Sequence, residues 1–304
     1  MRGAISYPNG PPLGLSDAEM AAGYLLLCQA RAESDLQLEL HEVRPADRTD
    51  TLRLPCRIET AVPVASDVMR VLLRPPPVLE FVFKPGQYVD ILLPGGRRRS
   101  FSVASPPHDA RMLELHVRRV PGGEFSEWLF GNAALKPAEA LITIEGPLGQ
   151  FFYRDTPSTA GPILMVAGGT GLAPLLSILR HIIEKKIDRE LILYWGVRCA
   201  RDLYADLSLR RLLEGTTRAR YVPVLSQSEA QWQGRTGYVH AAVLQDLGDL
   251  GAYDIYAAGP PAMIAAVRRE FPARGAVPDR LYYESFDYAP GSSDLQRTSA
   301  ETNS

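Results

Sequence analysis

Residues 165–182, MVAGGTGLAPLLSILRHI, join an unbroken apolar run to a cluster of glycines and then to a helical pattern. The apolar run starts near residue 162 and predicts a strand that is buried on both faces. Pro174 suits the first turn of the helix that follows. Glycines at such a junction let the backbone approach a phosphate, which the free N–H groups of the helix attract. The segment alone is weak evidence for a phosphate site and also fits a tight turn that binds nothing, because Pro174 holds the last position of a G-x-G-x-x-G pattern.

The same alternation continues along the chain and predicts a parallel, doubly wound sheet. Ligands of such sheets bind beyond the carboxyl ends of the strands. The further buried-strand patterns lie at 190–197, 220–226, 253–260 and 280–286, and the helical patterns lie at 173–186, 203–214, 238–247 and 261–271.

Upstream of this region the pattern is one of short strands separated by Gly and Pro. Such spacing predicts an antiparallel sandwich or barrel. One helix, near 126–129, interrupts the series. The strand patterns lie at 68–75, 86–94, 100–105, 112–119 and 140–147.

The two ends of the chain do not resemble domains. Residues 1–47 offer turn chemistry, one short helix at 17–22 with Ser16 as its N-cap, and one strand around the apolar run 24–27. That is too little to bury a core. The polar tail 289–304 is expected to be disordered. We therefore expect a β-barrel at 51–156 and an α/β domain at 160–288.

Composition excludes several functions. A formal net charge of −2 gives no signature of nucleic-acid binding, although residues 97–99 are a local run of arginines. Three scattered cysteines argue against a disulfide framework, and five histidines show no zinc-site spacing. We see neither a membrane-spanning run nor a signal peptide. The sequence predicts a cytoplasmic protein.

Two segments of the strand-rich region carry candidate binding groups. In RRRSFSVAS (97–105), Arg99 and Phe101 share one face of a strand and Ser102 points to the other. A cation, an aromatic ring and a hydroxyl in this order could meet the phosphate, ring and ring nitrogen of a flat cofactor. In VRRVPGGEFSEWL (117–129), two glycines and Ser126 precede a short helix and could form an anion cradle. Taken alone, the first segment is better explained by a solvated charge run beside a core Phe, and the second is explained equally well by an ordinary N-cap.

Seven motifs in sequence order are far more specific than any one of them. Together they resemble the ferredoxin–NADP reductase superfamily over about residues 54–288, with the greatest likeness to reductase components of bacterial oxygenases and to CDP-6-deoxy-glucoseen reductases. They are RSFS (99–102), PGGEFS (121–126), GPLGQF (146–151), AGGTGLAP (167–174), GRTGYV (234–239), AAGPPAM (257–263) and YYESF (282–286).

The resemblance implies an FAD-binding barrel, an NAD(P)H-binding domain and residue roles that follow the matching motifs. Ser102, Glu284 and Phe286 would lie at the flavin ring, where the nicotinamide delivers hydride. Arg99 would contact the flavin pyrophosphate and Phe101 would pack on the isoalloxazine. The full implied set of cofactor-binding residues is Arg99, Ser100, Phe101, Ser102, His116, Val117, Gly122, Gly123, Ser126, Gly168, Gly169, Thr170, Gly171, Pro174, Arg198, Gly259, Pro260, Met263 and Phe286.

Two departures from the family pattern stand out. Ala258 replaces the Cys that many relatives have beside the nicotinamide, and Phe101 replaces a Tyr. The choice of nucleotide depends on the end of the second buried strand, where arginine favours NADP and an acidic residue favours NAD. Arg198 and Arg201 are present there with Asp202, which is also a plausible helix N-cap. The likeness to oxygenase reductases favours NADH.

Cys28 ends the run GYLLLC and matches the fourth ligand of a [2Fe–2S] cluster in a plant-type ferredoxin domain, which often precedes the barrel in the resembling reductases. The other three ligands are not in the sequence, so we expect no metal in this chain. Residues 1–47 are interpreted as the remnant of such a domain, either because the true start lies upstream or because the chain is a truncated paralogue. The cluster would be present only if the gene extends upstream.

The leading hypothesis is an FAD-dependent NAD(P)H oxidoreductase that passes electrons to a protein acceptor, such as an oxygenase, a dehydratase or an iron–sulfur protein. One alternative is a free flavin or quinone reductase that needs no protein partner. Another is a flavin-binding redox partner that has lost turnover, which the missing cluster and Ala258 would motivate.

Overall fold

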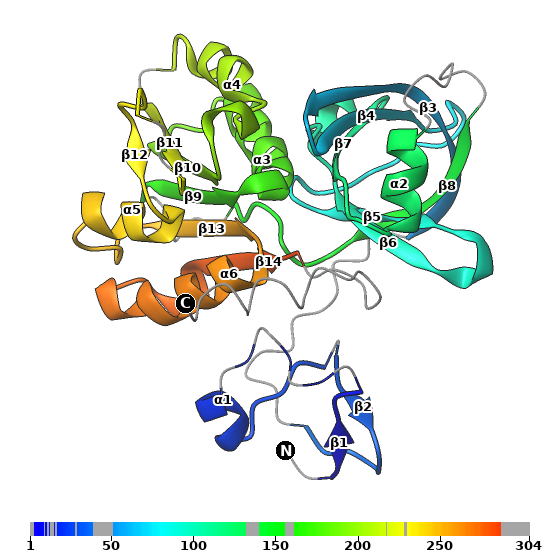
Figure 1. Cartoon of the computed structure of the whole chain (residues 1–304), viewed down its shortest axis with the longest axis horizontal. Helices are drawn as coiled ribbons and strands as arrows, with labels where there is room; N and C mark the ends of the chain where they lie inside the picture. Colours follow the sequence, from blue (N-terminus) through cyan, green and yellow to red (C-terminus); the bar gives the residue numbers. More distant parts are fainter. Residues whose placement is uncertain are drawn as a thin grey trace.

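The computed structural model describes residues 3–8, 10, 12, 15, 17–27, 29–38, 51–131, 140–155, 161–216, 218–227 and 230–286. The predicted N-cap Ser16, Cys28 and the tail 289–304 lie outside these residues. Figure 1 shows the two large sheets side by side, with the N-terminal segment below them.

The first sheet is an antiparallel barrel of six strands in the order β6-β5-β8-β3-β4-β7. A bridge between Val103 and Leu115 joins its first and last strands and closes it. Helix α2 (Glu124–Gly131) interrupts the strands, as predicted. The strands are β3 (Leu52–Ala65), β4 (Val68–Arg74), β5 (Tyr88–Leu92), β6 (Arg98–Ser102), β7 (Leu113–Arg118) and β8 (Leu141–Leu148).

Strand β3 is the longest in the barrel and lies outside the predicted strand patterns. Its first half pairs with β8 and its second half with β4, so it links the two halves of the sheet. Pro55 and Pro63 lie inside it, and proline argues against a strand although apolar residues alternate from Leu52 to Ile58. The inward side chains Leu54, Cys56 and Ile58 are nevertheless almost fully buried.

The second sheet is parallel, in the order β12-β11-β10-β9-β13-β14, and confirms the predicted doubly wound pattern. Helices α3 and α4 pack with the core on one face, and α5 and α6 pack on the other (Figure 1). The elements are β9 (Ile163–Gly168), α3 (Leu172–Glu184), β10 (Leu191–Val197), α4 (Asp206–Leu213), β11 (Ala219–Leu225), β12 (Arg235–Thr236), α5 (Val239–Asp246), β13 (Asp254–Gly259), α6 (Pro261–Glu270) and β14 (Leu281–Ser285).

Strand order places β9, the first strand of this sheet in the sequence, between β10 and β13 at the middle of the sheet. Every residue of β9 and β13 is buried, which explains their unbroken apolar sequences. The large side chains Tyr194, Trp195 and Tyr256 are wholly buried, and each contributes roughly 2 kcal/mol from the apolar surface it removes from water.

The N-terminal segment contains α1 (Asp17–Ala21) and a two-stranded ladder of β1 (Ile5–Ser6) and β2 (Arg31–Ala32). The helix was predicted, but the strand expected around 24–27 is wrong. The backbone there folds into turns, with Tyr24 donating to the Glu19 carbonyl and Ala30 donating to the Leu26 carbonyl. An apolar run pairs as a strand only if a neighbouring strand accepts its ladder, and none of the described residues does so here.

Candidate functional site

The loop after β9 is buried and tightly formed. Gly168 ends the strand, and residues 169–171 make one turn of 3₁₀ helix that runs directly into α3. Gly169 has a φ of +55°, a conformation that glycine adopts without steric cost. The indole N–H of Trp195 donates to the Gly169 carbonyl at 2.9 Å. The turn is therefore fixed by the fold around it, and Pro174 lies in the first turn of α3 as predicted.

The glycines of this loop also allow the ends of β9 and β13 to approach each other. A Cβ on Gly171 would lie 2.0 Å from the Ala258 carbonyl oxygen. One on Gly168 would meet the Met263 sulfur at 2.7 Å, and one on Gly259 would meet the Met263 methyl at 2.8 Å. Four of the implied nucleotide-binding positions thus lie together at one carboxyl edge of the sheet, where ligands of this architecture bind. Close packing is reason enough for glycine at 168, 171 and 259, whatever binds there.

The end of β14 adjoins the same edge. Glu284 is aligned with Ala258 in the ladder, and the Phe286 N–H donates to the Gly259 carbonyl at 3.0 Å. Both residues are half-buried. Ala258 is fully buried within the core, so the residue that replaces the family's cysteine has a packing role as well.

The arginine run of the barrel consists of Arg97 and the first two residues of β6, and the three arginines differ in their partners. Arg97 pairs with Glu124 at 3.0 Å, and Arg98 pairs with Glu145. Arg99 donates at 2.7 Å to the Arg98 carbonyl and, within the described residues, pairs with no carboxylate. No carboxylate among the described residues therefore neutralises the charge of Arg99.

The neighbouring positions on β6 alternate as predicted. Phe101 is half-buried and its ring packs on Phe125 of α2, with 5.5 Å between ring centroids. Ser102, on the other face, is 8% exposed. The Ser100 hydroxyl donates to Asp90 at 2.6 Å, so this hydroxyl is already engaged.

The loop before α2 is a turn that is closed by a hydrogen bond to the Ser126 side chain. Gly122 has a φ of +72°, and a Cβ on Gly123 would lie 2.8 Å from the Ser126 hydroxyl. The Val120 N–H donates to that hydroxyl at 3.0 Å. Ser126 is the third residue of α2 and not its N-cap, so a phosphate there would have to share this hydroxyl.

His116 and Val117 lie on β7 and are both buried. Val117 is wholly inside the barrel core, so only its backbone could reach a cofactor. His116 Nε2 is 2.9 Å from Glu114, and its Nδ1 is 3.0 Å from the hydroxyl of Tyr204 in the parallel-sheet region. Because an ionised Glu114 accepts a hydrogen bond from Nε2–H, the unprotonated Nδ1 of a neutral ring accepts a hydrogen bond from the Tyr204 hydroxyl.

These residues belong to a buried polar interface between the barrel and α3. Arg180 donates to Glu114 at 2.9 Å and to the Ala104 carbonyl at 3.1 Å, and Ser177 donates to the Ser105 carbonyl at 2.8 Å. Burial alone would raise the pKa of Glu114, but the hydrogen bond from His116 and the charge of Arg180 outweigh it and lower the pKa to about 2. Burial raises the pKa of Tyr204.

Sequence reasoning missed this interface entirely. Glu114 and Tyr204 are separated by 90 positions, and neither belongs to a recognisable motif. Tyr204 contacts His116, and Arg180 contacts Glu114, only because the barrel docks beside the parallel sheet, and no local sequence pattern predicts docking.

A second group of charges joins the two regions at the end of β10. The Asp67 carboxylate, from the β3–β4 turn, lies 3.3 Å from Arg118 Nε and 3.4 Å from Arg198 Nη2. Arg198 also lies 3.6 Å from Asp202. Asp202 is 4% exposed and accepts from the Cys199 N–H; Cys199 is the N-cap of the short 3₁₀ helix 200–202 and Asp202 is its third residue, so the prediction of Asp202 as the N-cap is wrong.

The guanidinium of Arg118 faces the glycine loop. A Cβ on Gly169 would lie 3.1 Å from the nearest nitrogen of Arg118. The loop and this cation of the barrel are therefore so close that a larger residue at 169 would crowd the guanidinium. A buried glycine turn, a helix N-terminus and an arginine together fit the phosphates of a dinucleotide. The unpaired Arg99 and the half-buried Phe101 fit the pyrophosphate and ring of a flavin on the barrel.

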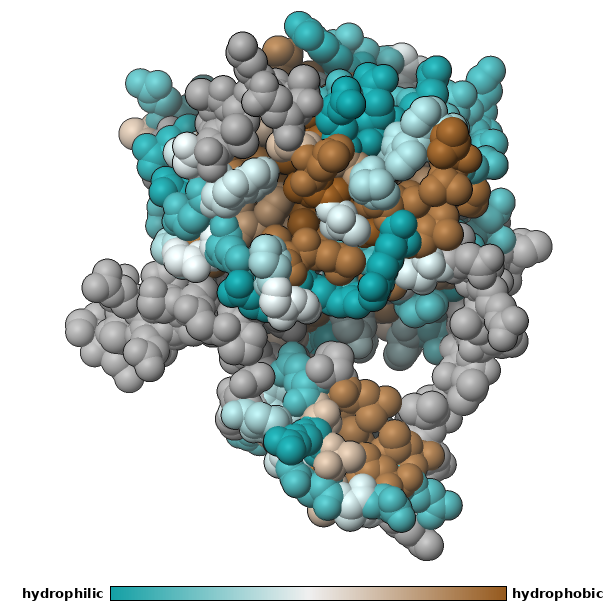
Figure 2. Space-filling view, turned by 90° about the vertical axis from the view of Figure 1, so that its right-hand side faces the viewer, coloured by the Kyte–Doolittle hydropathy of each residue, from teal (hydrophilic) through white to brown (hydrophobic). Residues whose placement is uncertain are grey.

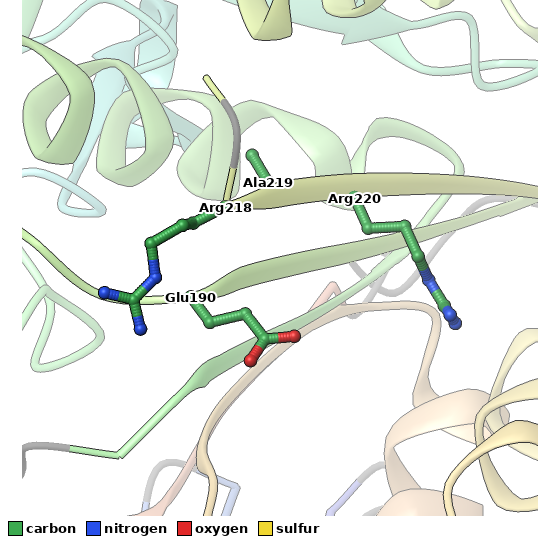
Figure 3. Close-up of a pocket in the computed structure, with 4 residues that line it drawn as sticks. All are labelled: Glu190, Arg218, Ala219 and Arg220. Atoms are coloured by element: carbon green, nitrogen blue, oxygen red, sulfur yellow. The ribbon is translucent and has the colours of Figure 1, made fainter.

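The pocket at the opposite edge of the parallel sheet has a different lining. A shallow pocket lined by Glu190, Arg218, Ala219 and Arg220 lies at the amino ends of β10 and β11, the edge opposite the glycine loop (Figure 3). Within the described part of the chain, no three His, Cys, Asp or Glu side chains gather as metal ligands. No helix described is both long and apolar enough to cross a bilayer. Apolar surface gathers on the barrel side and on the N-terminal segment (Figure 2), where Tyr24 and Leu27 are about half exposed.

Comparison with known proteins identifies both halves. Residues 55–153 match the oxidoreductase FAD-binding domain family, and residues 165–269 match the oxidoreductase NAD-binding domain family. The chain is 35% identical to the CDP-6-deoxy-L-threo-D-glycero-4-hexulose-3-dehydrase reductase of Yersinia pseudotuberculosis, over 90% of this chain and 80% of that protein. It is 37% identical to the aromatic O-demethylase reductase subunit of an Amycolatopsis species, over 94% of this chain and 85% of that protein.

The solved structures agree. The Amycolatopsis cytochrome P450 reductase GcoB superposes with a TM-score of 0.74 at 34% identity, covering 94% of this chain and 85% of that one. The ferredoxin reductase of carbazole 1,9a-dioxygenase superposes with a TM-score of 0.71 at 28% identity, covering 94% of this chain and 84% of that one. The chain therefore belongs to the ferredoxin reductase-like oxidoreductases and is an FAD-dependent NAD(P)H oxidoreductase.

Proposed function

We propose that this enzyme is the reductase component of a two-protein system, which takes hydride from NADH and passes electrons to a protein acceptor. The observation that carries the proposal is the position of the glycine loop against the barrel, with the Arg118 guanidinium 3.1 Å from the Gly169 Cβ position. A nucleotide on the loop thereby meets the flavin domain. The names of the relatives, which are reductases of a dehydrase and of a demethylase, support a protein acceptor.

When bound, FAD supplies acceptance of a hydride and release of its electrons. The residues of the protein would hold and orient the two cofactors. Gly168–Gly171 and α3 would hold the nucleotide phosphates, and Gly259, Pro260 and Met263 would border the nicotinamide. Arg99 would neutralise the flavin pyrophosphate and Phe101 would lie against the ring, while Ser102, Glu284 and Phe286 would be nearest to the reacting atoms. The buried Glu114–Arg180 and His116–Tyr204 contacts would keep the two cofactors face to face.

Electron transfer and nucleotide choice are tested together by an anaerobic visible spectrum, recorded before and after addition of NADH and then NADPH. We expect a flavin spectrum that NADH bleaches at much lower concentration than NADPH. Bound flavin that neither nucleotide reduces would contradict the proposal and favour a non-catalytic module. Rapid turnover with free flavin, and none with any protein acceptor, would favour a flavin reductase.

We also propose that residues 1–47 are the C-terminal part of a [2Fe–2S] ferredoxin-type domain, with barrel and nucleotide domains at 51–156 and 160–288. The match to the Amycolatopsis reductase subunit extends over 291 residues, which is more than the two sheets span, and this supports the proposal. In-frame translation of the DNA upstream of Met1 tests it, because a C-x4-C-x2-C run is expected there. Cys56 and Cys199 are free thiols, which suits a cytoplasmic location.

A further inference from the structure

Asp67 is a barrel residue that stands at the nucleotide edge of the parallel sheet. Its backbone is fixed, because the Arg119 N–H donates to the Asp67 carbonyl at 2.7 Å. Its carboxylate then bridges two arginines from different regions, at 3.3 Å from Arg118 on β7 and 3.4 Å from Arg198 after β10. Arg118 faces the glycine loop, so the bridge lies beside the expected phosphate site.

Arg198 occupies the position that reads the ribose of a dinucleotide, directly beyond the second strand of the parallel sheet. Two carboxylates already share its charge, Asp67 at 3.4 Å and Asp202 at 3.6 Å. With Arg118, the group holds two positive and two negative charges. A 2′-phosphate brought to Arg198 would therefore meet two carboxylates, whereas an uncharged 2′-hydroxyl would not be repelled.

The bridge is also incomplete as a hydrogen-bonded structure. Asp67 Oδ1 and Arg118 Nε are both buried, and neither has a hydrogen-bond partner within the described residues. A buried acceptor without a donor is costly, and a bound ribose hydroxyl would supply one. The Asp67 side chain as a whole is 26% exposed, so part of it lies at the surface next to Arg118 and Arg198.

We propose that Asp67 is a selectivity residue for the nicotinamide nucleotide: by neutralising Arg198 from the barrel side, it favours a dinucleotide with a free 2′-hydroxyl and penalises one with a 2′-phosphate. The inference rests on the proposed function and assigns the NADH preference to a residue of the flavin domain. Arg201 is exposed and pairs with no carboxylate in the described part of the chain. If Asp67 does not penalise a 2′-phosphate, the free charge of Arg201 would favour NADPH.

The test is equilibrium binding of NAD⁺ and NADP⁺ to the full chain by calorimetry, with wild type, Asp67→Asn and Arg198→Gln. Wild type should bind NAD⁺ more tightly. Asp67→Asn should narrow the ratio of the two dissociation constants about threefold to tenfold by tightening NADP⁺, and Arg198→Gln should widen it by a similar factor. Both changes should shrink at high salt because they are electrostatic. Asp188→Asn is the matched control, since Asp188 is exposed and pairs with Arg218 instead.

The outcomes separate the two proposals. A wild type that prefers NAD⁺, with its ratio unchanged in Asp67→Asn, would overturn this inference alone. A wild type that prefers NADP⁺ would overturn this inference together with the choice of NADH in the proposed function, but not the transfer of electrons to a protein acceptor. A wild type that binds neither nucleotide would overturn the proposed function as well. If Asp67→Asn does not fold, the opposite shift in Arg198→Gln decides, and its absence would overturn the inference.

Discussion

The nucleotide-facing loop and the flavin-facing strand are built on different principles. Residues 168–171 are all buried, and their backbone lies within contact distance of the next strand at several atoms. Strand β6 instead presents exposed or half-buried arginines and a half-buried Phe101. The loop is determined by steric fit, and the strand by charge and by a ring face.

The difference predicts two kinds of response to substitution. A close-packed loop fails abruptly, because neighbouring backbone cannot yield to an added atom. A charged strand loses affinity in steps, because each side chain contributes separately. The predictions below run from the abrupt response to the slightest.

Gly171→Ala should give the largest loss of stability among these predictions. The new Cβ would lie 2.0 Å from the Ala258 carbonyl oxygen, and both residues are buried. We expect a loss of ~4 kcal/mol in the free energy of unfolding, measured by chemical denaturation, and loss of nucleotide binding. Gly248→Ala is the control, because nothing lies within 4 Å of its Cβ position and its φ is not positive. An unchanged midpoint in Gly171→Ala would show that the loop is not close-packed.

Glu114→Gln should destabilise the joint between the two regions. The pKa of Glu114 is lowered to about 2, so its carboxylate stabilises the fold at all pH values above about 4.5. That stabilisation, about 3 kcal/mol, is lost as the pH falls from about 4.5 to about 2. The variant should therefore be less stable at pH 7 and show a flatter decline over this acid range, as measured by thermal melting at a series of pH values. Parallel curves for the two proteins would contradict the assignment.

Arg99→Ala should weaken flavin retention without disturbing the fold. A charge-assisted bond to a phosphate contributes about 2 kcal/mol, so the dissociation constant of FAD should rise roughly 30-fold. Flavin fluorescence during dilution measures it. Arg97→Ala is the matched control, because Arg97 lies two residues away and already pairs with Glu124. Equal losses in the two variants would mean that the general charge of the strand matters and Arg99 itself does not.

How far the sequence could predict this molecule depends on how local each feature is. The path from β9 through the glycines into α3 was predictable, because burial and helical periodicity are written into adjacent residues. Strand β3 was not, because Pro55 and Pro63 argue against a strand, whereas the ladder with β8 tolerates Pro55 on its exposed face. The apolar run 24–27 shows the reverse error, an apolar pattern without a pairing partner among the described residues.

The site residues show the same difference between features that adjacent residues encode and features that depend on distant parts of the chain. The glycine loop and Arg99 are recognisable as motifs, and the structure brings Gly168, Gly171, Gly259 and Phe286 to one edge. Asp67 and Tyr204 carry no motif. Their importance arises from docking of the barrel against the parallel sheet, which depends on the complementarity of two surfaces and not on any one segment.

Tyr204→Phe should give the smallest effect, and it asks whether the loop and the strand act as one site. The substitution removes the hydroxyl that lies 3.0 Å from His116 Nδ1 and keeps the edge-to-face ring contact, in which the centroids are 5.3 Å apart. Leaving a buried ring nitrogen without its donor costs ~1 kcal/mol, so the melting temperature should fall by a few degrees at most. Tyr238→Phe, at a tyrosine that is 70% exposed, should change nothing. If the rate of flavin reduction by NADH falls together with the small loss of stability, the contact orients the two cofactors. If only the melting temperature falls, the glycine loop and strand β6 bind their ligands independently. The steric fit of the loop and the charged surface of the strand then belong to two separate, adjacent sites.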